Sequence, residues 1–218
     1  MTIHTSMEFR SATLLGTGAG TGFEALLPAS PLQPATLYSS GSEIYAQGEK
    51  AGDLYQVEFG AVRVYRLLAD GRRQISAFHL SGEVFGFEAD KTHHFFAEAI
   101  GATGIRVMRP HAGIDFSREL LPLALQSLVR AQEHLLVLGR QNAAERVAAF
   151  LLDMAARQGD LEEIDLPMSR SDIGDYLGLT IETVSRVFSR LKEKGIVRLP
   201  GLRKVKIVRM HTLRDMSE

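Results

Sequence analysis

The spacing of hydrophobic and polar positions changes along the chain, and each change predicts a different kind of element. From residue 35 to about residue 110, apolar and polar residues alternate in short runs, which is the period of a half-buried β-strand. The runs are Leu54–Phe59, Ala61–Arg66 and Ile75–Leu80, and they are divided by Gly60, Asp70-Gly71 and Ser81-Gly82. Asp-Gly between two such runs is a strong hairpin signal. Many short strands at this spacing predict a small antiparallel β-barrel or jelly roll.

After Pro110 the period becomes helical. Residues from about 117 to 157 predict helix, and one row of positions recurs there at alternating intervals of four and three residues, as in a coiled-coil seam. The row consists of Leu121, Leu125, Leu128, Gln132, Leu135, Gly139 and Asn142. Such a seam can pack against the chain's own barrel or against a second copy of the chain. A second helix, Ala143–Arg157, follows the seam and leads to the C-terminal part.

The C-terminal part predicts two helices joined by a tight turn. Residues 168–179 supply a short helix and a turn that contains Gly178, and the run from Thr180 opens a second helix. On a helix, positions i, i+3 and i+4 share a face, so Glu182, Ser185 and Arg186 project together. Arg can bind guanine with two hydrogen bonds, Glu can accept one from cytosine N4, and Ser adapts to several bases. We therefore predict a helix-turn-helix whose second helix enters a major groove and whose three side chains contact bases.

A hairpin follows the second helix and makes the unit a winged one. Residues 195–209 alternate around a turn near Pro200-Gly201, and Arg203, Lys204 and Lys206 on this hairpin are available for phosphates. The predicted contacts to DNA phosphates are Ser169, Arg170, Ser171, Thr180, Thr183, Arg190, Arg203 and Lys204.

This unit decides between the two interpretations of the seam. A helix-turn-helix protein usually gains site size by dimerising on a two-fold DNA site, so we expect the seam to pair two copies of the chain. The predicted dimer contacts are Leu121, Leu125, Leu128, Gln132 and Leu135.

The distribution of charge supports a DNA partner. The chain has 218 residues and a net charge of −1, but residues 169–214 hold eleven Lys and Arg against four Asp and Glu. This segment carries +7 and the remainder −8, which is the asymmetry expected of a basic module that meets phosphates. No stretch approaches the roughly 20 apolar residues of a membrane span, and no signal peptide opens the chain. We expect a cytoplasmic protein with no membrane partner.

Composition and motifs also argue against other kinds of site. The chain contains no cysteine, which excludes disulfides, thiolate zinc sites and cysteine-ligated iron–sulfur clusters. It contains no HExxH, GxSxG or P-loop motif and no His–carboxylate cluster at metal-ligand spacing, so we expect neither an enzyme nor a metal site. The glycines of residues 16–22 do not complete a nucleotide-binding pattern. A barrel that holds a small ligand, and a scaffold that uses the seam for partner assembly, are the other interpretations.

A β-barrel, a long dimer helix and a winged helix-turn-helix, in this order, resemble the Crp/Fnr family of bacterial transcription regulators over nearly the whole chain. The trio of Glu182, Ser185 and Arg186 resembles the recognition residues of the Fnr branch. The cyclic-AMP-responsive branch differs, because it carries an Arg at the position of Ile181. The segment 142–152 also resembles that branch. The resemblance implies a TTGAT-N4-ATCAA palindrome, with Arg186 on guanine, Glu182 on the paired cytosine or a neighbouring base, and Ser185 on an adjacent A·T pair.

The resemblance also bears on what the barrel senses. Phe95-Phe96 stand where a cyclic-nucleotide-binding relative carries an Arg-Ser pair, and phenyl rings cannot offset the desolvation of a phosphate, so cyclic AMP is not expected. The cysteine-less members resemble either FixK, controlled through its synthesis, or the Dnr and NnrR proteins, proposed to sense nitric oxide through haem. His93-His94 keep haem open as an alternative to ordinary loop histidines. The segment 82–89 resembles the FixK group, and we predict this subgroup with no cofactor.

The resulting prediction is an α+β protein in four parts. These are a flexible lead-in at 1–34, a cyclic-nucleotide-binding-like barrel at 35–115, a dimerisation helix at 116–142 and a winged helix-turn-helix domain at 143–218. Family resemblance implies a homodimer that binds double-stranded DNA and RNA polymerase and activates microaerobic or anaerobic genes.

Overall fold

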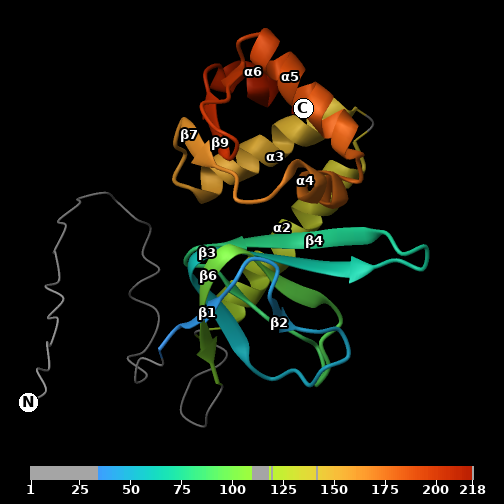
Figure 1. Cartoon of the computed structure of the whole chain (residues 1–218), viewed down its shortest axis with the longest axis vertical. Helices are drawn as coiled ribbons and strands as arrows, with labels where there is room; N and C mark the ends of the chain where they lie inside the picture. Colours follow the sequence, from blue (N-terminus) through green and yellow to red (C-terminus); the bar gives the residue numbers. More distant parts are fainter. Residues whose placement is uncertain (1–33, 110–117, 119, 141, 218) are drawn as a thin grey trace, which may run out of the picture.

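The computed structural model of the chain describes residues 34–109, 118, 120–140 and 142–217 (Figure 1). The predicted lead-in, apart from residue 34, and its glycine run at 16–22 lie outside the described residues, as does the segment 110–117. Among the described residues, no helix is both long enough and apolar enough to cross a membrane.

The N-terminal half is an antiparallel sheet domain, as predicted. Its strands are β1 Thr36–Tyr38, β2 Glu43–Tyr45, β3 Leu54–Leu67, β4 Arg73–Leu80, β5 Val84–Phe85 and β6 Phe96–Met108. The order is β1-β6-β3-β4, with β2 paired to β6 and β5 paired to β3, and every pairing is antiparallel. The hairpin predicted at Asp70-Gly71 joins β3 to β4, and Gly71 has the positive φ of 81° that this turn requires.

Gly60 does not separate two strands, which corrects the division predicted there. β3 runs through Gly60 as one strand, although its register against β6 shifts on either side of Phe59. Gly60 has a φ of +84°, and a Cβ at this position would lie 2.6 Å from the Ala102 carbonyl oxygen. Glycine is needed here because two backbones pass unusually close at a bulge, not because the chain turns.

The helical region consists of two helices, α2 Leu121–Leu138 and α3 Ala143–Arg157. The predicted seam therefore ends earlier than its spacing suggested. Gly139 is the C-cap of α2, and Asn142 is the N-cap of α3, where its side chain accepts a hydrogen bond of 2.9 Å from the Ala144 amide. The start of α3 agrees with the prediction.

The C-terminal part is a winged helix-turn-helix. It contains β7 Glu163–Asp165, α4 Arg170–Leu177, α5 Ile181–Glu193, β8 Val197–Arg198, β9 Lys204–Ile207 and α6 Met210–Asp215. β8 and β9 form the predicted hairpin, and β7 adds to β9 to complete a three-stranded antiparallel sheet. The strand β7 and the short helix α6 were not predicted.

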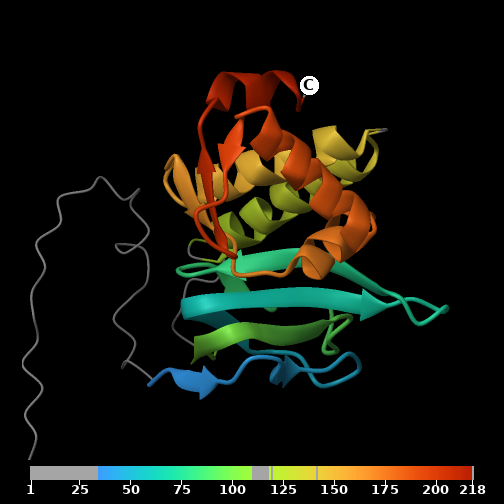
Figure 2. The same ribbon diagram turned by 45° about the horizontal axis from the view of Figure 1, so that its top comes forward.

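A continuous hydrophobic core joins the two halves. Val147, Phe150, Leu151 and Met154 of α3 are buried, and they belong to the same cluster as Phe78 of β4 and the apolar faces of α4 and α5. In Figure 2 the helices lie on one side of the sheet, with α4 directly against it and α5 and α6 farther away. A second, smaller cluster fills the interior of the sheet domain. The helix-turn-helix is thus packed onto the barrel and not suspended from a linker.

Candidate nucleic-acid interface

Local capping builds the helix-turn-helix. Ser169 caps α4 by accepting the Asp172 amide, while the Asp172 carboxylate accepts the Ser169 amide, which is a complete capping box. Gly178 ends α4 in the left-handed conformation, with a φ of 64°. Thr180 then caps α5 by accepting the Thr183 amide at 3.2 Å. These signals lie within eleven residues of one another, so local sequence sets where the two helices end and begin.

The three predicted base-reading side chains lie on one exposed face of α5. Glu182, Ser185 and Arg186 are exposed, whereas the opposite face buries Val184, Val187, Phe188 and Leu191. Hydrogen bonds from its own backbone amide and from Thr180 lower the pKa of the Glu182 carboxyl, with a smaller contribution from Arg186. Glu182 is therefore an acceptor at neutral pH, as a cytosine N4 donor requires.

Most of the predicted phosphate contacts lie near the first turns of the two helices. Ser169 and Ser171 are exposed at the start of α4, and Thr180 is exposed at the start of α5. Helix N-termini offer free amides and a positive dipole end to phosphates. Thr183, half-buried, accepts a hydrogen bond of 3.3 Å from Arg186.

Arg170 is engaged inside the unit. Its guanidinium lies 3.3 Å from the centre of the Phe188 ring, and burial lowers the pKa of Arg170 to about 10. In the free chain Arg170, which was predicted to contact a phosphate, therefore joins α4 to the buried face of α5 through this cation–π contact.

The two lysines of the wing, Lys204 and Lys206, have carboxylate partners within the chain. Lys204 Nζ lies 3.5 Å from Glu163 Oε1 and 3.9 Å from Asp165 Oδ1, both on β7. Arg203 is exposed at the end of the wing, and its Nη1 lies 3.9 Å from the position that a Cβ of Gly101 on β6 would take. The sequence interpretation missed the carboxylates on β7 because it did not pair β7 with β9.

A hollow of about 450 Å³ lies between α5 and the start of α3. Arg186, Arg190 and Lys194 line it at intervals of four residues, together with the start of α3. Lys194, which was not among the predicted contacts, is exposed at the C-cap of α5.

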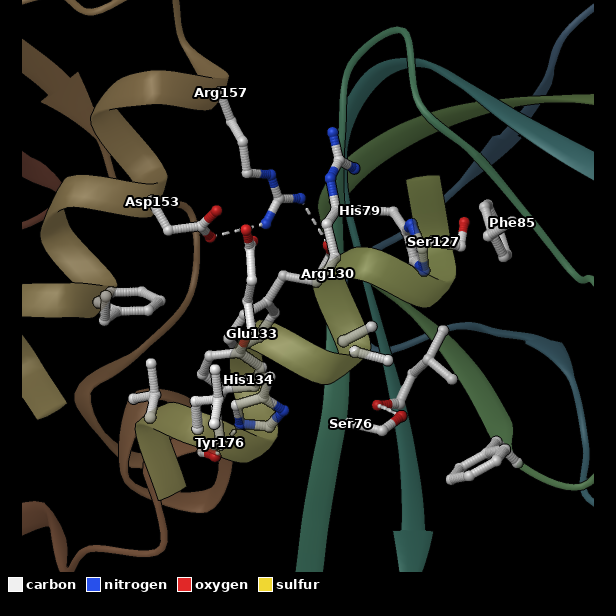
Figure 3. A pocket seen from close by; sticks show the side chains of 18 of the residues that line it. Ser76, His79, Phe85, Ser127, Arg130, Glu133, His134, Asp153, Arg157 and Tyr176 are labelled. Carbon is white, nitrogen blue, oxygen red and sulfur yellow. Dashed lines mark hydrogen bonds and ion pairs between the residues drawn. The ribbon is translucent and has the colours of Figure 1, made fainter. Parts of the chain in front are cut away.

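A larger pocket of about 670 Å³ lies between the sheet, α2 and α3 (Figure 3). Phe85, Phe87 and Phe95 line its sheet side, and Arg130 and Arg157 line it opposite. Both arginines pair with Glu83: Arg157 Nη2 lies 2.7 Å from its Oε2, and Arg130 Nη1 lies 2.9 Å from its Oε1. Burial alone would raise the pKa of Glu83, but the two arginines lower it.

The Phe95-Phe96 segment of this pocket supplies no cation for a cyclic phosphate. A cyclic phosphate needs cations or oriented donors that are free to offset its desolvation. Here Phe95 and the carboxylate Glu88 line the pocket, and the guanidinium groups of Arg130 and Arg157 pair with Glu83. Arg140 also lines it, and its buried Nη1 has no hydrogen-bond partner among the described residues. Phe96, the second residue of the predicted pair, stacks on Tyr65 instead, with ring centroids 5.3 Å apart.

The two histidines considered for haem belong to the barrel. His93 is buried and stacks on Tyr45 with ring centroids 3.7 Å apart. The Nδ1 atoms of His93 and His94 lie 3.2 Å and 3.0 Å from the two carboxylate oxygens of Glu88. Within the described residues, no group of three or more His, Asp or Glu side chains is placed to hold a metal ion.

The predicted dimer row lies on the exposed face of α2. Leu121, Leu125, Leu128 and Leu135 each expose half or more of their surface, from 50 to 67%. Gln132 is also exposed. The other side of α2 packs on its own chain, where Leu123 and His134 are buried. The helix α2 thus has one face packed on its own chain and one exposed apolar face that is free to meet a second copy.

Comparisons with known proteins agree with this architecture. The family model of the Crp-like helix-turn-helix domain matches residues 145–216, and that of the cyclic nucleotide-binding domain matches residues 35–108. A sensor-like sheet domain followed by a helix-turn-helix defines a transcription regulator. The chain belongs to the Crp/Fnr family of these regulators.

Individual relatives narrow the group. The nitrogen fixation regulation protein FixK of Rhizobium meliloti (strain 1021) is 53% identical over 189 residues, which are 87% of this chain and 90% of the relative. The transcriptional activatory protein AadR of Rhodopseudomonas palustris is 40% identical over 177 residues, 75% of this chain and 73% of the relative. The structure of FixK2 from Bradyrhizobium japonicum is 46% identical and covers 84% of this chain and 98% of its own, with a TM-score of 0.79. The chain is a FixK-like DNA-binding transcription regulator.

Proposed function

We propose that the chain acts as a homodimer on a TTGAT-N4-ATCAA palindrome and activates transcription through contacts with RNA polymerase. The observation that carries this proposal is the exposed face of α5, where Glu182, Ser185 and Arg186 point away from the protein core. Their chemistry matches a G·C pair flanked by A·T pairs. The activator role draws on the printed names of relatives, one of which is a transcriptional activatory protein.

The exposed row on α2 supports the homodimer. Four leucines at coiled-coil spacing leave an apolar stripe in water, and pairing with the same stripe of a second copy would cover it. A two-fold dimer would carry two copies of α5, which is the symmetry of the palindrome. In this proposal residues 35–115 form the sensor-like domain, residues 116–142 the dimer helix and residues 143–218 the DNA-binding domain.

A regulator gated by a small ligand is the second candidate, because the pocket between the sheet and α2 is large enough for one. Its lining includes five phenyl rings beside charged groups, which favours a ligand with a large apolar part and a polar end. The haem-dependent alternative is checked by the absorbance of the purified protein with and without added haem. DNA binding by the protein in air without any addition supports the cofactor-free proposal.

The direct test is a fluorescence anisotropy titration of the palindrome and of a scrambled duplex at several salt concentrations. We expect at least about 1000-fold tighter binding to the palindrome. Binding to both duplexes should weaken steeply between about 50 and 200 mM salt, because phosphate contacts release counterions. Equal affinity for the two duplexes would overturn the proposal.

A further inference from the structure

Two arginines of the sheet domain hold the first helix of the helix-turn-helix. Arg63 on β3 and Arg73 on β4 both donate to Asp172 Oδ1, at 3.1 Å and 2.6 Å. Arg73 also donates through Nε and Nη2 to Asp175 Oδ2, at 2.9 Å and 2.7 Å. Each pair joins residues about 100 positions apart in the sequence. In Figure 1, α4 lies directly over β4, and α5 lies beyond it.

These contacts are largely removed from solvent. The side chain of Asp172 is 4% exposed, and those of Arg63 and Arg73 are 17% and 24% exposed. A charge-assisted hydrogen bond in such surroundings is strong, and loss of Arg73 would remove the ion pair of Asp175 and one of the two ion pairs of Asp172. Burial opposes ionisation of Asp172, but bonds from Ser169 and the two arginines hold its pKa below the usual range. The network is therefore ionised near neutral pH.

The same helix is held from two further directions. Gln74 on β4 donates to the Asp175 carbonyl at 2.7 Å. From α2, His134 Nε2 lies 2.8 Å from the Tyr176 carbonyl, and the two rings stack with centroids 3.8 Å apart. The helix α4 thus contacts both the sheet and the helix that carries the exposed leucine row. Its position sets the position of α5, since only Gly178, Leu179 and Thr180 separate the two helices.

We infer that Arg63 and Arg73 are positioning residues that set the distance between the two recognition helices of the dimer, and so the preferred spacing between half-sites. This inference rests on the proposed function. In the proposed function, neither arginine contacts a DNA base. They fix α4, and through it α5, relative to the sheet, and His134 joins α4 to α2. Glu182, Ser185 and Arg186 stay exposed for contact with bases. Loss of Arg63 and Arg73 would let the orientation of the DNA-binding domain vary, while the side chains that contact bases stay the same.

The test measures half-site spacing and not affinity alone. Arg73→Gln and Asp175→Asn are titrated against palindromes with spacers of three, four and five base pairs, and against a duplex with one half-site. Each added base pair moves a half-site by about 3.4 Å along the DNA. Asp172 is left intact because it also caps α4. Arg72→Gln is the matched control. Arg72 Nε lies 2.7 Å from Asp70 Oδ2 at the tip of the β3–β4 hairpin, where both side chains are exposed.

We expect either variant to bind the four-base-pair spacer about tenfold more weakly and to lose most of its preference over the other spacers. Affinity for the single half-site should stay within about twofold of the parent, and the double variant should be no worse than Arg73→Gln alone. An unchanged spacer preference in both variants would overturn the inference, as would an equal loss on every duplex. If the unmodified protein shows no preference for the palindrome, the proposed function itself fails.

Discussion

The guanidinium of Arg170 lies over the ring of Phe188, 3.3 Å from its centre, and joins the two helices of the helix-turn-helix. Phe188 is buried, so the cation covers the edge of the core between α4 and α5. Sequence reasoning assigned Arg170 to a DNA phosphate. The structure adds a packing role that this residue fulfils before any DNA is bound.

Arg170→Ala should therefore destabilise the free protein. A half-buried cation–π contact contributes about 1–2 kcal/mol, and the substitution also uncovers apolar surface. Urea unfolding followed by circular dichroism measures the change, with Ser171→Ala, an exposed neighbour on α4, as the control. If Arg170→Ala unfolds at the same urea concentration as the control, the stacking has no energetic role.

Leu128→Glu should separate the dimer into monomers. Leu128 lies in the exposed row of α2, and pairing two copies there would bring two glutamates into an apolar seam. Sedimentation velocity reports the mass directly. Gln126→Glu adds the same charge to an exposed position of the same helix outside the row, and it should remain dimeric. A dimeric Leu128→Glu variant would place the interface on another face.

The salt dependence of DNA binding should separate two kinds of cation. Arg190→Ala removes a cation from the α5 face and should reduce the slope of log affinity against log salt by about one unit. Lys204→Ala should reduce it by less, because Lys204 already lies near Glu163 and Asp165 in the free chain. A larger effect for Lys204 than for Arg190 would show that the wing leaves its carboxylate partners on DNA.

His79 should make the protein less stable in mild acid. Burial lowers the pKa of His79 to about 4, although Glu83 opposes the shift. The unfolded chain binds this proton near pH 6.5, whereas the folded protein resists it down to about pH 4. The unfolded state thus binds more protons in this interval, and the free energy of unfolding falls by roughly 2–3 kcal/mol as the pH drops from about 6.5 to about 4.

His79→Gln checks that assignment. Urea unfolding from pH 7 to pH 4 should show a flatter profile than the parent over this interval. His211→Gln changes an exposed histidine on α6 and should keep the parent's profile. If the two variants give the same profile, another group accounts for the acid sensitivity.

Local signals account for the parts of the fold that the sequence predicts. Ser169, Gly178 and Thr180 each act on neighbours within a few residues, so the helix-turn-helix is readable without a structure. The leucine row on α2 is equally local, since helical spacing alone brings it to one face. By contrast, Gly60 was interpreted as a strand break because its role depends on β6, some forty residues away.

The polar contacts between the halves could not be predicted for the same reason. Arg63 and Arg73 look like ordinary charged positions on strands, and Asp175 looks like a solvated helix residue. Only the packing of α4 on β4 brings them together. The pairing of β7 with β9, which gives Lys204 its acidic neighbours, is likewise a long-range event between short strands.

The most direct test of base reading combines one protein change with one DNA change. Arg186→Ala and the parent are each titrated against the palindrome and against a palindrome with adenine in place of the guanine of each half-site. We expect the parent to lose about 1–3 kcal/mol per half-site on the changed DNA, and Arg186→Ala to bind both duplexes with the same weakened affinity. If Arg186→Ala still prefers guanine by the same margin as the parent, Arg186 does not read that base.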